Sequence, residues 1–438
     1  MADMTITGPA PDLASLLKAR PFLSLDETDG LCFEGVSLKS IAMQYGTPVW
    51  VYGAGEMRRR YRALNAALAA QDLPAHIHYA VKANGHLAIL DLFRRLGAGA
   101  DVVSLGEFLR ARRAGIAPDD VVYSGVGKSE AELKAALAAG IGQINVESAE
   151  ELAMLSGIAS GLGVQATVAL RMNPDVDAGT HAKITTGLAE NKFGIAAADI
   201  PALYAHAASL PGLRPVGLAL HIGSQILSPT PYATAYAKGA DMVRHLRAQG
   251  QNVEALDLGG GIGIGYGAEP GLDLAAYAAT IRRTVGGLGL RLMVEPGRYL
   301  TGPAGLLLAS VILQKHTQKR FVVLDAAMTE LMRPALYEAW HGILPLDAAD
   351  FSVPVSPADV VGPVCESADS FAENRALPDL PPGRLVALLD AGAYGAEMSS
   401  TYNARPRAAS VLADAGTARL ITPRQSIEDL WADEILPG

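Results

Sequence analysis

The stretch His78-Tyr79-Ala80-Val81-Lys82-Ala83-Asn84 places a lysine at the end of an apolar run, Ala75 to Val81, that is typical of a buried strand. A buried ammonium is costly unless it is paired or neutralised, so a strand interior disfavours lysine. A lysine whose pKa is lowered by burial can form a Schiff base with an aldehyde cofactor. Taken alone, the stretch favours an ammonium in solvent just past the strand. The rest of the chain reverses that preference.

Strand-like and helical patterns alternate from about residue 54 to residue 300. Short strands that alternate with helices of about 10–15 residues predict right-handed βαβ units and a parallel sheet. Eight such strands favour a closed (β/α)8 barrel over an open doubly wound sheet, which is the alternative. The predicted strands are Ile77–Lys82, Ala100–Ser104, Val121–Ser124, Gln143–Val146, Thr167–Met172, Val216–Ile222, Ala255–Leu258 and Leu290–Glu295.

The sequence after the predicted barrel has a different pattern. Strand-like runs separated by Pro and Gly begin near residue 305, and residues 22 to 51 resemble short strands with a turn. We therefore predict an α/β fold plus a β part, in which a barrel spans residues 52–304. A discontinuous, mainly β domain is formed by residues 1–51 and 305–438.

Composition excludes several functional classes. The 438 residues are 50% hydrophobic and 18% charged, and the net charge of -9 argues against nucleic-acid binding. Cys32 and Cys365 form neither a disulfide framework nor a CxxC pattern, so we expect a cytoplasmic protein without a metal site. The N-terminus lacks a signal-peptide pattern, and the longest apolar run is too short to span a bilayer.

Residues that can carry chemistry follow several predicted strands. In a barrel the C-terminal strand ends share one rim, where active sites lie. We therefore expect Lys82, His221, Gly259–Gly261 and Glu295–Arg298 to converge. Successive backbone N–H groups of the glycine run suit a phosphate, and a flexible turn is the less favoured alternative.

Two further motifs each allow two interpretations. Gly263-x-Gly265-x-x-Ala268 matches a dinucleotide fingerprint, but Pro270 follows and no helix begins there, so the required context is missing. In Glu295-Pro296-Gly297-Arg298, a carboxylate facing a pyridine nitrogen would keep that nitrogen protonated and make the ring an electron sink. The alternative for this turn is a surface salt bridge that contributes little.

The motifs YAVKAN, HIGSQ, GGGIG and EPGR, in this order, resemble the fold-type III pyridoxal-phosphate decarboxylases. Further segments narrow the resemblance to the diaminopimelate decarboxylases, and it runs from about Gly35 to Arg407. These segments are Arg171–Pro174 with Lys192–Gly194, Arg333–Tyr337, Gly362–Ser367 and Asp390–Tyr394.

The resemblance implies a role for each motif residue. Lys82 would hold pyridoxal 5′-phosphate covalently, Glu295 would face the ring nitrogen, and His221 would stack on the ring. Cys365 would be the proton donor, although a lone cysteine is more often a small buried hydrophobe. The full implied cofactor site is Lys82, His221, Ser224, Gly259, Gly260, Gly261, Glu295, Pro296, Gly297, Arg298 and Tyr394.

Substrate choice follows from charge. Diaminopimelate carries an ammonium and a carboxylate at its distal end, whereas ornithine carries only an ammonium. Arg298 and Arg333 can bind that carboxylate bidentately, and Glu366 can pair with the ammonium. Tyr337 and Tyr394 can add hydroxyl groups. The alternative for Arg333 and Glu366 is a structural ion pair.

These implications predict a homodimeric enzyme that converts meso-2,6-diaminopimelate to L-lysine, with Cys365 and Glu366 reaching the barrel of the partner subunit. A related decarboxylase acting on ornithine, arginine, carboxynorspermidine or a carrier-linked amino acid remains an alternative. A non-catalytic binding module would not need Cys365 and Glu366. A racemase would need protonating groups on both faces of the substrate.

Overall fold

The computed structural model describes residues 10–178 and 192–437. Its chain divides into two compact units. The first comprises Arg60–Ile264 and Gly271–Tyr299, and the second comprises the chain up to Arg59, Gly265–Pro270 and the chain from Leu300. No described helix is long and apolar enough to cross a membrane.

Eight parallel strands of the first unit form a closed barrel. The ring is closed because the last barrel strand pairs with the first, Val294 with Ile77, and the fourth pairs with the fifth, Ile144 with Val168. The prediction of a closed barrel rather than an open sheet is therefore confirmed. The strands are β5 (Ala75–Ala80), β6 (Gly99–Val102), β7 (Val121–Tyr123), β8 (Gln143–Val146), β9 (Ala166–Asn173), β11 (Leu213–Ala219), β12 (Ala255–Asp257) and β13 (Arg291–Val294), and the short β10 (Ile195–Ala196) pairs with β9.

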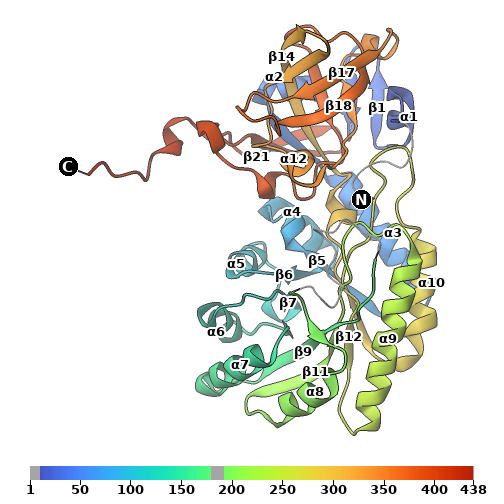
Figure 1. The fold of residues 1–438 in the computed structure, drawn as a ribbon, viewed down its shortest axis with the longest axis vertical. Helices are drawn as coiled ribbons and strands as arrows, with labels where there is room; N and C mark the ends of the chain where they lie inside the picture. The colour runs from blue at the N-terminus through green and yellow to red at the C-terminus, as the bar shows by residue number, and fades with distance from the viewer. Residues whose placement is uncertain (1–9, 179–191, 438) are drawn as a thin grey trace. The chain divides into compact units, whose positions relative to one another are not determined.

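Helices follow the strands and lie around the outside of the barrel (Figure 1). Serine side chains accept hydrogen bonds from first-turn amides: Ser104 from Glu107 N and Ser148 from Glu151 N. Such caps satisfy amides that the helix cannot and contribute about 1 kcal/mol each. The helices are α4 (Leu87–Arg95), α5 (Leu105–Arg113), α6 (Glu130–Ala138), α7 (Ala149–Leu162), α8 (Ile200–Ser209), α9 (Pro229–Ala248) and α10 (Leu274–Thr284).

The second unit is built mainly from strands, and β4 (Val49–Gly53) is central in its largest sheet. This strand pairs with β14 (Gly305–His316) on one side and β20 (Ala409–Asp414) on the other. The N-terminal segment thus joins the C-terminal sheet. The other strands of this sheet are β15 (Arg320–Leu324), β16 (Ile343–Pro345), β17 (Ser356–Val361), β18 (Ser370–Leu377), β19 (Leu385–Leu388) and β21 (Thr417–Thr422).

The remaining elements complete the second unit and its connections. A separate three-stranded sheet contains β1, β2 and β3. The helices α3 and α11 run across the division between the two units. These elements are α1 (Leu13–Lys18), β1 (Leu23–Asp26), β2 (Gly30–Phe33), β3 (Val36–Ser37), α2 (Leu38–Tyr45), α3 (Ala54–Ala69), α11 (Arg298–Thr301) and α12 (Arg333–Tyr337).

Two local predictions were wrong. Residues 38–45, expected to be strand and turn, form α2, because Leu38, Ile41 and Ala42 have the spacing of one helical face and are buried. Lys82 was expected at the end of a strand. The strand β5 ends at Ala80 instead, and Lys82 lies in a 3₁₀ turn, Val81–Ala83.

Candidate active site

Lys82 extends from the turn after β5 and forms an ion pair inside the first unit. Its Nζ lies 3.0 Å from Oδ2 of Asp101, whose side chain is fully buried, whereas that of Lys82 is 34% exposed. Parallel pairing of β5 with β6 places Ala80 opposite Asp101, so the turn just beyond Ala80 lies near this carboxylate. The lysine is therefore neither inside a strand nor free in solvent. It is a half-buried amine held beside a buried anion.

Two more carboxyl groups follow neighbouring strands. Asp257, at the end of β12, accepts hydrogen bonds from Asn145 Nδ2 and Gly259 N, both at 2.9 Å. Glu295, just after β13, is 6% exposed, and its Oε1 has no hydrogen-bond partner among the described residues. Burial, together with nearby Asp101 and Asp257, raises the pKa of Glu295 well above its ordinary value. A cation in front of Glu295 would favour its ionised form.

His221 follows β11 and contacts the glycine run. Its Nδ1 accepts a hydrogen bond of 3.3 Å from Gly260 N. Burial, then the charges of Arg171 and Lys82, lower the pKa of His221 well below its ordinary value. The ring is thus neutral near pH 7, and its flat face suits stacking.

The glycine run needs glycine for steric reasons. A Cβ on Gly259 would lie 2.2 Å from Leu220 O, and one on Gly260 would lie 2.1 Å from Glu295 O. Gly259 and Gly261 also have positive φ values of 69° and 93°. Backbone segments can approach each other here only because Cβ atoms are absent.

Arg298 and Ser224 form a hydrogen bond within the first unit. Arg298 is 5% exposed, and its Nη2 donates a 3.1 Å hydrogen bond to Ser224 Oγ. A Cβ on Gly297 would lie 3.0 Å from Ala83 Cβ, so the Glu295–Arg298 turn packs closely against the Lys82 turn. Pro296 accepts a backbone hydrogen bond from Ala80 N at 3.3 Å, which fastens the two turns together.

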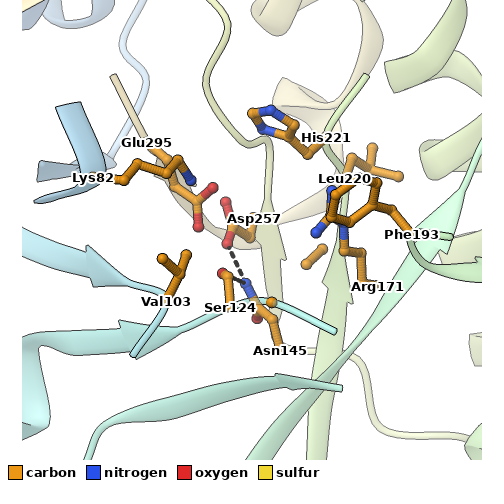
Figure 2. Close-up of a pocket in the computed structure, with 12 residues that line it drawn as sticks. Lys82, Val103, Ser124, Asn145, Arg171, Phe193, Leu220, His221, Asp257 and Glu295 are labelled. Atoms are coloured by element: carbon orange, nitrogen blue, oxygen red, sulfur yellow. Dashed lines mark hydrogen bonds between the residues drawn. The ribbon is translucent and has the colours of Figure 1, made fainter. Parts of the chain in front are cut away.

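A cavity of about 270 Å³ lies beside Lys82, His221, Asp257 and Glu295. Figure 2 shows Lys82, Glu295 and Asp257 facing His221 and Arg171 around it. Arg171 Nη1 donates to Glu147 Oε1 at 2.8 Å, which positions the guanidinium. The cavity is lined by Lys82, Val103, Ser124, Gly125, Asn145, Arg171, Phe193, Ala219, Leu220, His221, Asp257 and Glu295.

Comparison with known proteins assigns the chain to a family. Residues 54–302 match the model of the pyridoxal-dependent decarboxylases, pyridoxal binding domain. Diaminopimelate decarboxylase of Zymomonas mobilis is 47% identical over 92% of this chain and 96% of its own. That of Pseudomonas aeruginosa is 45% identical over the same shares. The chain belongs to the diaminopimelate decarboxylase family.

A solved structure agrees with this assignment. Diaminopimelate decarboxylase from Helicobacter pylori, in complex with L-lysine, superimposes with a TM-score of 0.87 at 40% identity. The match covers 90% of this chain and 98% of the other. The resemblance first seen in four short motifs therefore extends over both units.

The diaminopimelate decarboxylases use pyridoxal phosphate, and the cavity fits that group. The unsatisfied Glu295 Oε1 can accept a hydrogen bond from a protonated ring nitrogen. The Lys82 amine can attach to the aldehyde, and the neutral His221 can face the ring. Gly259 N and Gly260 N already donate to Asp257 and His221, so a phosphate contact with the glycine run would fall to the half-buried Gly261. Each chemical part of the cofactor thus has a suitable group in the first unit.

The predicted substrate residues Arg333 and Tyr337 lie on α12 in the second unit. Arg333 is fully buried; its Nη1 lies 2.9 Å from His341 Nε2, and its guanidinium lies 4.9 Å from the centre of the Tyr266 ring. His341 Nδ1 is 2.7 Å from Leu389 O and donates to it, which leaves Nε2 as the acceptor. Tyr337 is half-buried.

Cys365, Glu366 and Tyr394 also belong to the second unit. Cys365 and Glu366 are both exposed, and Glu366 Oε1 accepts a 2.6 Å hydrogen bond from Tyr402 OH. The alternative of an Arg333–Glu366 ion pair is wrong for the described chain, since Glu366 pairs with Tyr402. Tyr394 has a φ of 56°, in the left-handed region, within the Asp390–Tyr394 turn.

That turn is anchored by a buried ion pair. Arg20 forms a bidentate salt bridge with Asp390, and both side chains are at most 3% exposed. Arg20 Nη2 also donates to Tyr266 O at 2.7 Å. A buried guanidinium with several acceptors resists rotation, so the backbone at Asp390 is held in its left-handed conformation.

Three polar residues of the site were not predicted from the sequence: Asn145 and Asp257, which line the cavity, and Asp101, which pairs with Lys82. All three lie inside predicted strands, whereas active-site groups were expected at the C-terminal ends of the strands. Each is at most 2% exposed. A charged or amide side chain within an otherwise apolar strand is the signal that could have found them, because burial there requires a partner.

Proposed function

We propose that this enzyme decarboxylates meso-2,6-diaminopimelate to L-lysine and carbon dioxide, the last step of lysine biosynthesis. The convergence of Lys82, His221 and Glu295 on one cavity, in a chain that matches its relatives along almost their whole length, carries the proposal. On that basis we assign diaminopimelate, the substrate in the relatives' names, to this chain as well.

The cavity residues divide the chemical work. Bound pyridoxal phosphate supplies the electron sink that a departing carboxylate requires. Lys82 Nζ would hold the cofactor covalently, and Asp101, 3.0 Å away, would keep that amine oriented. Glu295 would stabilise a protonated ring nitrogen, and the neutral ring of His221 would cover one face. Ser224, Gly259–Gly261 and Tyr394 would bind the phosphate.

Cys365 donates the proton that completes the reaction. Its Sγ protonates the substrate α-carbon once carbon dioxide has left. Cys365 and Glu366 are exposed in the single chain, whereas proton transfer needs a site from which bulk water is excluded. A second copy of the chain would cover them. We therefore propose a homodimer with two shared sites, in which each barrel receives Cys365 and Glu366 from the other chain.

Charge selects the substrate. The distal carboxylate of diaminopimelate is bound by Arg298 and Arg333, and its ammonium is bound by Glu366. Tyr337 and Tyr394 contribute hydroxyl groups. A basic amino acid without that carboxylate would leave these buried guanidinium groups without their anion, which is strongly unfavourable.

The two parts of the chain have separate tasks in this proposal. Residues 52–304 form the cofactor-binding barrel, and residues 1–51 with 305–438 form the β domain that supplies substrate and dimer contacts. The family match at residues 54–302 supports this division. We also propose a cytoplasmic location, because both cysteines are unpaired thiols, as a reducing compartment requires.

Amino-acid analysis after incubation with substrate tests the function. The pure protein with pyridoxal phosphate is incubated with meso-diaminopimelate, ornithine or arginine in parallel. We expect lysine from the first substrate and no amine product from the others. Putrescine or agmatine without lysine would preserve the cofactor chemistry and overturn the roles of Arg333 and Glu366.

The variant Arg333→Lys tests the specificity argument directly. It keeps the charge but removes bidentate geometry, so kcat/KM for diaminopimelate should fall by roughly 10- to 150-fold, the value of one charge-assisted hydrogen bond. Arg375→Lys is the matched control, since Arg375 is also buried, at 5% exposed, donates to His341 O at 2.8 Å and has no proposed substrate contact. Equal losses in both variants would remove Arg333 from the substrate pocket.

A further inference from the structure

A cluster of potential metal ligands lies at the N-terminal ends of the barrel strands, away from the residues that line the cavity. One ligand atom from each of His76, His78 and Asp120 lies within 4.8 Å of the others. His76 and His78 belong to β5, and Asp120 immediately precedes β7. His76 Nε2 is 2.9 Å from Asp120 Oδ1.

Strand register explains why these side chains meet. His76 and His78 are two residues apart on one strand, so their side chains share a face. His78 pairs with Gly99 on β6, and Ala100 pairs with Val121 on β7. His78, Gly99 and Asp120 therefore form one row across three strands.

Gly99 makes the row possible. A Cβ at Gly99 would lie 2.6 Å from His78 Cδ2 and 2.7 Å from Asp120 Oδ1. Any other residue in the middle of the row would push the imidazole and the carboxylate apart. With glycine there, the two side chains approach each other across β6.

The imidazole of His78 provides an independent observation. The residue is only 5% exposed, and its Nδ1 is enclosed without a hydrogen-bond partner. Its Nε2 lies 3.6 Å from Asp120 Oδ1, beyond hydrogen-bond range. Within the described chain, this buried ring therefore makes no hydrogen bond. Leaving a buried polar group unsatisfied costs about 1–3 kcal/mol in general. An ion bound at Nε2, the nitrogen that faces Asp120, would give the ring one of its two missing partners.

We propose that His76, His78 and Asp120 form a binding site for a divalent transition-metal ion, with Zn²⁺ the best fit. Two imidazole nitrogens and one carboxylate oxygen are a typical zinc ligand set, with water in the fourth position. His76 and Asp120 are 42% and 39% exposed, so the ion and its water can enter from solvent. The site departs from the sequence-based expectation of no metal.

The bound ion stabilises the barrel. It links β5 to β7 across β6 at the face of a (β/α)8 barrel that contributes to stability rather than to catalysis. An ion that binds only the folded state stabilises it by an amount that grows with the logarithm of the ion concentration above Kd. None of the three ligands lines the catalytic cavity, so decarboxylation does not require the ion.

Zinc binding by the holoenzyme tests the proposal. Chelator-treated protein is dialysed against Zn²⁺, and bound metal is measured by elemental analysis beside thermal unfolding with and without Zn²⁺. His76→Ala and Asp120→Asn each remove one ligand, and His206→Ala removes an exposed histidine from α8 as the control.

We expect the wild type and His206→Ala to retain about one more equivalent of Zn²⁺ than His76→Ala and Asp120→Asn. Zinc should also raise Tm in the first two proteins only. Equal stoichiometry and equal Tm shifts in all four would overturn the site. If His76→Ala without metal unfolded at a much lower temperature than the wild type, the isosteric Asp120→Asn would decide the result, because it preserves side-chain shape.

Discussion

At the scale of single residues, the chemistry depends on which groups the barrel leaves unsatisfied. Lys82 has a buried carboxylate beside it, whereas Glu295 is nearly enclosed with one oxygen lacking a hydrogen bond among the described residues. The two groups therefore interact with a cofactor in different ways. The amine offers a point of attachment, and the carboxylate offers an anion whose burial is relieved by a cation.

Replacing Lys82 by Ala should lower turnover of diaminopimelate by at least about 10³-fold, because no other group can take over covalent attachment. The measurement is lysine formation together with the absorbance of protein-bound cofactor. Lys134→Ala serves as control, since Lys134 is exposed on α6. Substantial activity of the Lys82→Ala variant would refute the scheme.

At the scale of secondary-structure elements, the strand ends β12 and β13 concentrate acidic groups in a dry site. The pKa of Asp257 is raised by burial, and that of Glu295 is raised by burial and by Asp101 and Asp257. Two adjacent strands thus bring together carboxyl groups that resist joint ionisation. The apoprotein therefore becomes less stable as these carboxyl groups lose their protons.

The stability of the apoprotein should consequently fall as pH rises above about 4.5, the unfolded-state pKa of Glu295. Folded Glu295 keeps its proton while unfolded Glu295 loses it, so each pH unit up to the raised folded pKa removes about 1.4 kcal/mol. Glu295→Gln should flatten this dependence. We would measure Tm against pH for both apoproteins; parallel curves would show that Glu295 does not titrate as inferred.

At the scale of the whole molecule, the role proposed for Cys365 predicts how two chains would combine. If the proton donor of one chain serves the barrel of another, two inactive variants can complement each other. Mixing equal amounts of unfolded Lys82→Ala and Cys365→Ala chains and refolding them with cofactor should restore about a quarter of wild-type activity. Half of the dimers are then mixed, and each mixed dimer has one intact site. No recovery, with both variants folded, would indicate that each site belongs to one chain.

Much of the barrel is encoded locally. The alternation of short apolar strands with amphipathic helices placed all eight strands within a few residues, and serine caps mark several helix starts. Lys82, His221 and Glu295 could be expected in one site because parallel strands of a barrel share a rim. These features depend on periodicity and topology, which a sequence carries directly.

Other features required the tertiary structure. Asp101 and Asp257 are ordinary acidic residues in the sequence, and only barrel closure brings them together beside Glu295, where desolvation changes their chemistry. His76, His78 and Asp120 have no metal-binding spacing, since 44 positions separate His76 from Asp120. The register of β5, β6 and β7 across Gly99 joins them. Sequence determined which elements form, whereas packing decided which charges and ligands meet, because burial and distance exist only in three dimensions.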